Sequence, residues 1–169
     1  MIGYHPALDP THAAFRIVRL FCMERGRMWE RDRLRIADFF LLFPAAIPTM
    51  RLPRGQVRWR AVFQHRSNRY WRSGHPKAHF DRVRPFHDAG TRLLLGVGAI
   101  RVRDVAGHTM TEFVVDRLPP GLLRRAQKRN SEDSEFTDFV RQVILVEELT
   151  GASGLKDRTG LLEFRYDPV

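Results

Sequence analysis

Residues 32–48, DRLRIADFFLLFPAAIP, form the most apolar stretch of the chain. Asp32 is a typical N-cap residue, and a residue that precedes a proline avoids the helical conformation. These signals predict a helix over residues 33–43 that ends at Pro44. Apolar side chains occupy almost its whole circumference, which is not typical of a helix that faces water. We therefore expect a central, mostly buried helix around which the chain packs. It is too short to span a bilayer, which takes about 20 apolar residues.

One carboxylate, Asp38, interrupts this apolar helix. A carboxylate in such surroundings can be a catalytic group with a raised pKa. A buried charge is more often neutralised by a partner, and arginines are abundant on both sides of this helix. We expect Asp38 either to form a structural ion pair or to face solvent.

An additional helix is predicted before the central one. Asp9 is a suitable N-cap and Pro10 a suitable first helical residue. The apolar residues that follow recur at helical spacing, and they are Ala14, Ile17, Val18 and Phe21. Gly26 marks the end of the helix, and residues 26–31 form a short polar connection that carries Trp29.

A third helix followed by a hairpin is predicted after residue 84. Pro85 opens the helix, whose apolar stripe is Phe86, Ala89, Leu93, Leu94 and Val97. Gly90 and Gly96 lie inside it, which indicates that another backbone comes close. The β-branched runs 99–105 and 109–115 are separated by a short loop that contains Gly107, which predicts a β-hairpin.

The last third of the chain is predicted to be mainly helical with a terminal strand. A short helix is expected over residues 121–129, with a basic face of Arg124, Arg125, Lys128 and Arg129. After a break at 130–133, Ser134 caps a helix that Gly151 closes. Residues 161–166 alternate as a strand whose apolar face is a candidate partner-binding surface, made of Leu162, Phe164 and Tyr166.

These elements predict an α+β fold in a single domain, residues 1–169. A helix, a connection, a helix and a hairpin are the elements of a winged-helix-like core at about 32–116. A basic insert at 51–84 interrupts that core. The extra N-terminal helix precedes it, and residues 117–169 form a C-terminal extension of helices and a strand.

The insert at 51–84 carries most of the net charge, since it has ten basic residues and one acidic residue, a balance of +9, where the whole chain has +10. Basic residues with interleaved aromatics are what a surface needs to contact phosphates and stack on bases. The same pattern also fits a loop whose aromatics dock on the core and whose arginines are solvated or meet an acidic partner protein. The candidate contacts with nucleic acid or an acidic partner are Arg51, Arg54, Arg58, Trp59, Arg60, Arg66, Arg69, Arg72 and Lys77.

Sequence motifs for catalysis or cofactor binding were not found. Cys22 is the single cysteine, which excludes an intramolecular disulfide and zinc sites that need paired cysteines. His75 and His79 are four apart, but Pro76 lies between them and no glutamate accompanies them. We expect no metal, no cofactor and no enzymatic activity. The N-terminus lacks the pattern of a signal peptide, so we expect a cytoplasmic protein without a membrane partner.

Four stretches resemble the small middle components of bacterial ABC-three-component defence operons, the group that includes Lamassu-like systems. They are YHPALDPTHAAFRIVRLF, DRLRIADFFLLFP, GAIRVRD and GLKDRTGLLEFRYD, and they cover about half of the chain. The resemblance implies a non-catalytic adaptor beside an SMC-like or ABC-type ATPase and an effector, often a nuclease, in protection against phage or plasmid DNA. The arginine-rich residues 51–77 depart from the pattern of these components.

Two further hypotheses come from other functional classes. A free-standing winged-helix regulator would bind DNA directly and form a symmetric dimer. A small nuclease would need a cluster of carboxylates or histidines, which the sequence does not contain.

Overall fold

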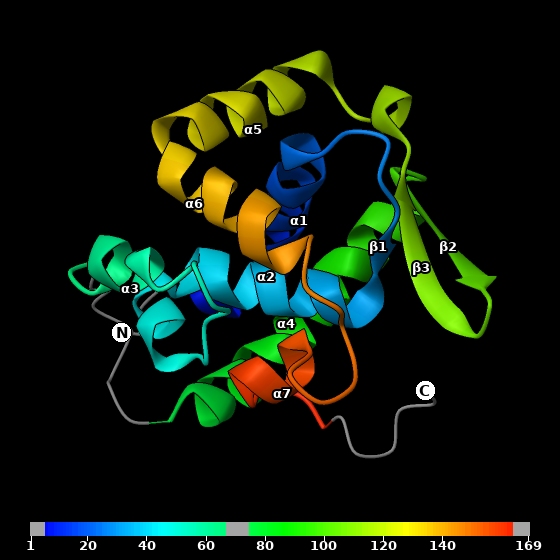
Figure 1. Ribbon diagram of the computed structural model, residues 1–169. Helices are drawn as coiled ribbons and strands as arrows, with labels where there is room; N and C mark the ends of the chain where they lie inside the picture. The colour runs from blue at the N-terminus through cyan, green and yellow to red at the C-terminus, as the bar shows by residue number, and fades with distance from the viewer. Residues whose placement is uncertain (1–5, 67–74, 164–169) are drawn as a thin grey trace, which may run out of the picture.

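The computed structural model describes residues 6–66 and 75–163, which form an α+β fold with one small antiparallel sheet (Figure 1). The helices are α1 (Pro10–Met23), α2 (Arg31–Leu42), α3 (Arg58–Phe63), α4 (Pro76–Gly96), α5 (Pro120–Glu132), α6 (Ser134–Phe139) and α7 (Leu155–Thr159). The strands are β1 (Trp29–Glu30), β2 (Ile100–Val105) and β3 (His108–Phe113). Short 3-10 turns occupy Pro6–Leu8, Pro44–Thr49 and Val115–Arg117, and α6 continues into a π-helical turn at Val140–Ile144.

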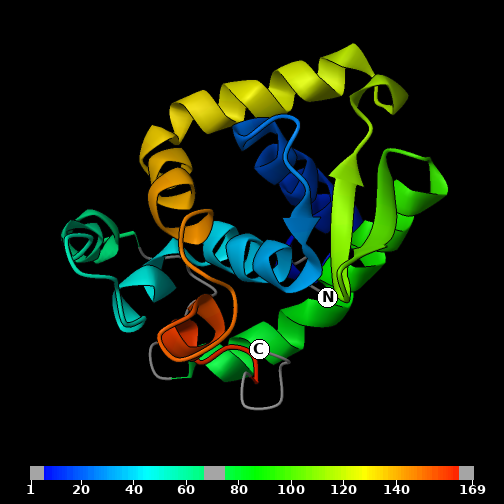
Figure 2. The same cartoon turned by 45° about the vertical axis from the view of Figure 1, so that its right-hand side comes forward.

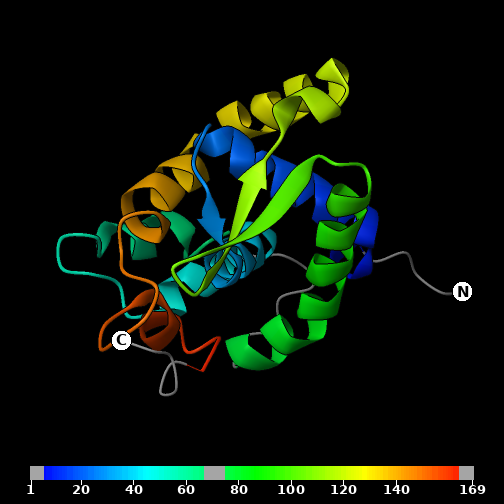
Figure 3. The ribbon, with the colours of Figure 1, turned by 90° about the vertical axis from the view of Figure 1, so that its right-hand side faces the viewer.

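The helix α2 lies at the centre of the molecule, as predicted, and Figure 3 views it nearly along its axis. Phe39 and Phe40 are almost completely buried, and their rings pack edge-on against Phe80 of α4 and Phe139 of α6. The helix begins two residues earlier than predicted, at Arg31, so Asp32 lies in the first turn instead of capping it. Within the described residues, no helix has the length and apolar character needed to cross a bilayer.

A buried ion-pair network joins α2 to its two neighbouring helices. Arg16 of α1 donates to Asp38 through Nε at 2.6 Å and Nη2 at 3.1 Å, and His87 Nδ1 of α4 lies 3.0 Å from Asp38 Oδ2. Burial alone would raise the pKa of Asp38, but the Arg16 charge and the His87 hydrogen bond lower it well below its ordinary value. The predicted ion pair is confirmed. Asp38 is an ionised carboxylate of α2 that binds side chains of α1 and α4.

The close approach of backbones predicted at the interior glycines is confirmed at Gly90. A Cβ atom there would lie 2.7 Å from the Ala14 amide nitrogen and 2.9 Å from the Pro10 carbonyl oxygen. At Gly96 the prediction is wrong, since a Cβ atom there would meet no atom within 4 Å. Only glycine at position 90 lets α1 and α4 pack at this distance.

The start of α4 was predicted nine residues too late. The helix begins at Pro76, and Pro85 lies at an exposed position inside it. The physical reason is that Phe80 and Val83, which precede the proline, are buried and give the first half of the helix its own apolar face. The basic insert is therefore not a continuous loop, because α3 and the first half of α4 belong to it.

The predicted hairpin is confirmed, and it belongs to a three-stranded sheet in the order β1-β3-β2. The third strand, β1, lies in the segment that we predicted as a polar connection. It forms because Trp29, fully buried, pairs with Thr111 of β3. The hairpin turn consists of Ala106 and Gly107, both with positive φ, as a type I′ turn requires.

The C-terminal part differs from the prediction in four places. The helix predicted to run from its cap at Ser134 to Gly151 ends with the π-helical turn at Ile144, and its N-cap is Asp133. The helix α5 continues to Glu132, so most of the predicted break at 130–133 is helical. The helix α7 was not predicted. Residues 161–163 contain no strand, because Leu161 is buried in the core instead of pairing along a sheet edge. Arg33 of α2 holds the turn at residues 144–147, which follows the π-helical turn, by donating to the carbonyl oxygens of Ile144 and Glu147.

Candidate interaction surfaces

Three arginines of the predicted basic contact surface bind other parts of the chain. Arg51 Nη2 lies 2.6 Å from Asp157 Oδ2, beside α7. Arg66 Nη1 lies 2.5 Å from Asp133 Oδ1, and its other terminal nitrogen reaches Glu135. Arg58 donates to the side-chain oxygen of Gln142. These arginines fasten the segment to α6, to the π-helical turn and to α7.

Trp59 lies in the hydrophobic core. Its side chain is 4% exposed, its ring packs edge-on against Phe139, and its indole N–H donates to Gln56 Oε1 at 2.8 Å. The guanidinium of Arg58 lies 4.6 Å from the centre of the same ring. This position agrees with the interpretation in which the aromatics of the segment dock on the core.

The other candidates of the segment differ in exposure, and Arg58 is exposed although it binds Gln142. Arg54, Arg58 and Arg60 are exposed and form what we call the α3 surface. Neither Arg54 nor Arg60 has an ion-pair partner among residues 6–66 and 75–163. Lys77 pairs with Asp81 at 2.5 Å on α4. Arg69 and Arg72 lie outside the described residues.

The C-terminal candidates are only partly described. Leu162 is half-buried and packs against the hydrophobic core. Phe164 and Tyr166 lie outside the described residues, so their role in partner binding stays a prediction.

An exposed apolar surface is present where α4 leads into the hairpin. We expected Leu93 and Val97 to be buried with Leu94, but they are 49% and 60% exposed, whereas Leu94 is buried. Leu95 and Val102 of β2 are also exposed. We use the name edge surface for the outer side of β2 together with these exposed residues, Leu93, Leu95, Val97 and Val102, of which Leu93 and Leu95 project from different sides of α4.

The outer edge of β2 carries unpaired backbone groups. The Val114 amide donates to the Ala99 carbonyl at 2.8 Å, and hydrogen-bonded pairs alternate along an antiparallel ladder. The backbone groups of Ile100, Val102 and Asp104 therefore point away from β3. No strand within the described residues pairs with this edge. Figures 1 and 2 show the hairpin and α3 on opposite sides of the molecule.

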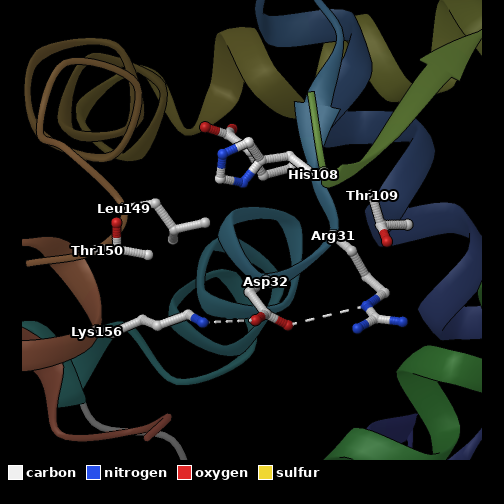
Figure 4. A pocket seen from close by; sticks show the side chains of 9 residues that line it. Arg31, Asp32, His108, Thr109, Leu149, Thr150 and Lys156 are labelled. Atoms are coloured by element: carbon white, nitrogen blue, oxygen red, sulfur yellow. Dashed lines mark ion pairs between the residues drawn. The ribbon is translucent and has the colours of Figure 1, made fainter. Parts of the chain in front are cut away.

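A small pocket of about 150 Å³ lies between the hairpin turn, the start of α2 and α7 (Figure 4). Its charged groups are paired, since Asp32 lies 2.9 Å from Lys156 Nζ and 3.0 Å from Arg35 Nη1. Burial would raise the pKa of Asp32, but the hydrogen bond and charge of Lys156 lower it below its ordinary value. An ion-paired carboxylate of low pKa is a poor proton donor, so this pocket has no general acid at Asp32.

The described residues hold no grouping of three or more histidine, cysteine, aspartate or glutamate side chains that could bind a metal ion. Two surfaces among the described residues carry the exposed groups named above: a basic α3 surface, and an edge surface with exposed apolar side chains and backbone donors and acceptors that β3 does not pair.

Comparison with known proteins gave one informative result. The chain matches the family described as ABC-three component (ABC-3C) system Middle Component 5 over residues 2–167. No curated protein and no solved structure matches it. Because the match spans nearly the whole chain and agrees with the resemblance of its sequence motifs, the protein belongs to the middle component 5 family of ABC-three-component systems.

Proposed function

We propose that this middle component is a non-catalytic adaptor that links an SMC-like or ABC-type ATPase to an effector subunit, such as a nuclease, in a complex for defence against phage or plasmid DNA. The observation that carries the proposal is the edge surface. An adaptor must bind protein, and this is the surface of the described chain best suited to it.

Strand addition explains how the edge surface would bind. Exposed strand edges tend to pair with strands of other chains unless charges, bulges or prolines prevent it. Here an added strand would exchange backbone hydrogen bonds with Val102 and Asp104, and it would have to match the exposed charges of Arg101 and Arg103 on β2. The exposed apolar side chain of Val102 would be covered beside it. Backbone hydrogen bonds would supply affinity, and the apolar contacts would supply specificity.

A second contact region supports the linking role. The α3 surface holds three exposed arginines on the side of the molecule opposite the hairpin (Figure 1). We propose that it docks on an acidic region of the other protein subunit, with possible DNA contact through the same cations. Two surfaces that face in opposite directions allow two partners to bind at once.

Co-purification of the variant Val102→Pro with the proposed ATPase and effector subunits tests the proposal. Proline removes an amide that points away from β3, so the hairpin ladder stays intact while strand addition is blocked. The matched control, Val102→Thr, keeps a β-branched residue and its amide. We expect Val102→Pro to lose one partner and Val102→Thr to retain both. Full assembly of a folded Val102→Pro variant would contradict the proposal.

A second candidate function is a winged-helix DNA-binding regulator. It is favoured by the chain order α1, β1, α2, α3, α4, β2, β3, in which α3 is an insertion and α4 directly precedes a hairpin wing, and by the sheet order β1-β3-β2. In this function the exposed Arg82 and Arg84 of α4 would contact duplex phosphates. A symmetric dimer whose binding to duplex DNA is weakened by Arg82→Gln/Arg84→Gln would favour the regulator over the adaptor.

A further inference from the structure

A basic groove of about 550 Å³ lies between α1 and α5, beside the end of α2. On α1 it is lined by residues at positions 12, 15, 16 and 19, and on α5 by residues at 125, 128, 129 and 132. This spacing places each set on a single face of its helix. The two helices are held in place by Arg19, which donates to Asn130 Oδ1 at 3.0 Å, and by Asn130, which donates back to the Arg19 carbonyl.

The mouth of the groove has more cations than carboxylates. Lys128 and Arg129 share the single carboxylate of Glu132, at 3.9 and 3.3 Å. Arg125 has no ion-pair partner in the described part of the chain, and its guanidinium lies 5.9 Å from the ring centre of Phe15. Three cations thus face one carboxylate, which leaves an excess of two positive charges at the opening.

Deeper in the groove, Arg19 is incompletely neutralised. Its nearest carboxylate, Asp133, lies 3.7 Å away and is shared with Arg66, which approaches to 2.5 Å. Burial lowers the pKa of Arg19, and this effect outweighs the attraction of Asp133, which raises it. An anion in the groove would therefore offset the positive charge of Arg19 as well as that of the cations at the mouth.

The groove also has an apolar wall. Phe15 of α1 and Leu42 at the end of α2 are partly buried, pack against the core, and line the cavity. An aromatic ring beside cations is the combination by which proteins hold a base and its phosphate together. The volume lies within the range of about 300–1,000 Å³ that is typical of pockets for small molecules.

We propose that the basic groove binds a phosphorylated nucleotide unit, with the base against Phe15 and Leu42 and the phosphates on Arg125, Lys128 and Arg129. The unit can be a free nucleotide or one residue of a single-stranded nucleic acid. An acidic protein segment would satisfy the cations but leave the apolar wall uncovered. The groove shares no residue with the edge surface, so a result that contradicts nucleotide binding would leave the proposed adaptor role untouched, and the reverse also holds.

The test is binding of a fluorescent twelve-nucleotide thymidine oligomer and of ATP to the full chain. The groove variant is Arg125→Gln/Lys128→Gln/Arg129→Gln. The control variant, Arg25→Gln/Arg92→Gln/Arg117→Gln, removes three exposed charges from other parts of the surface. We expect the groove variant to lose at least about tenfold in affinity, and the salt slope of oligomer binding to flatten by about 0.7 for each strand phosphate that the groove contacts. The control should change little.

The same assay distinguishes a free nucleotide from a single strand as the ligand of the groove. Stoichiometric binding of ATP that competes with the oligomer indicates a free nucleotide, and binding of the oligomer alone indicates a strand. Glu132→Gln should strengthen binding of either ligand, because it removes the competing carboxylate. Three results would overturn the proposal. They are an equal loss of affinity in the groove and control variants, no binding of either ligand to the wild type, and displacement of the bound oligomer by polyglutamate or inorganic tripolyphosphate as readily as by ATP.

Discussion

The substitution Gly90→Ala tests the packing of α1 on α4. An alanine Cβ would lie 2.7 Å from the Ala14 nitrogen, 2.9 Å from the Ala13 Cβ and 2.9 Å from the Pro10 carbonyl oxygen. Overpacking typically costs about 1–3 kcal/mol, and the upper end applies here because two of the three atoms belong to the backbone of α1. The better helix propensity of alanine offsets about 1 kcal/mol. The net loss of stability is therefore about 2 kcal/mol.

Thermal unfolding followed by circular dichroism measures this loss. For a chain of this length about 2 kcal/mol corresponds to a fall in Tm of about 4–8 °C. Gly96→Ala is a control in the same helix, because a Cβ atom there meets nothing within 4 Å and the residue has no positive φ. It should leave Tm unchanged or raise it. Equal melting of wild type and Gly90→Ala would refute the close approach of the two helices.

Three further predictions concern the core, the buried ion pair and the hairpin. Phe40→Ala should cost about 3–5 kcal/mol in urea unfolding, because the ring is buried, and unchanged stability would show that α2 is not central. Because the pKa of Asp38 is lowered in the folded protein, its ion pair contributes stability that is complete above the ordinary pKa of 3.8 and is lost as the pH falls through the folded-state pKa. Asp38→Asn should therefore be less stable at pH 7, and its stability should change less with pH in acid. An acid unfolding transition equal to that of the wild type would contradict this. Ala106→Gly should raise stability by up to about 1 kcal/mol because position 106 has a φ of 53°, and a lower Tm would refute the type I′ turn.

The elements with local signals were predictable from the sequence. The central helix, the glycine contact at Gly90 and the hairpin follow from patterns within a few residues of one another. The apolar residues around Asp38 indicated that it needs a partner, but they did not identify Arg16 and His87, which are 22 and 49 residues away. The strand β1 was not predictable in this way, because two residues become a strand only through pairing with β3. The start of α4 was misplaced because Pro85 was taken as a first helical residue.

The candidate surfaces were less predictable than the fold. Helical periodicity placed Leu93 and Val97 on a buried stripe, but the core-facing stripe of α4 ends with His87, Gly90 and Leu94, and Leu93 and Val97 lie outside it. The pairing of Arg66 with Asp133 joins residues 67 apart in the sequence, which composition cannot reveal. The basic face of residues 121–129 was visible in the sequence, but its juxtaposition with Phe15 and Arg19 depends on how α5 packs on α1.

Hydrogen–deuterium exchange of the chain alone and in complex with the proposed ATPase and effector is the most direct test of the proposed adaptor role. If an added strand covers the edge surface, the amides of Val102 and Asp104 should exchange freely in the isolated chain and become protected in the complex. The end of α4, which carries Leu93, Leu95 and Val97, should gain protection with them. Protection confined to other segments, with β2 exchanging at the same rate before and after assembly, would contradict the account.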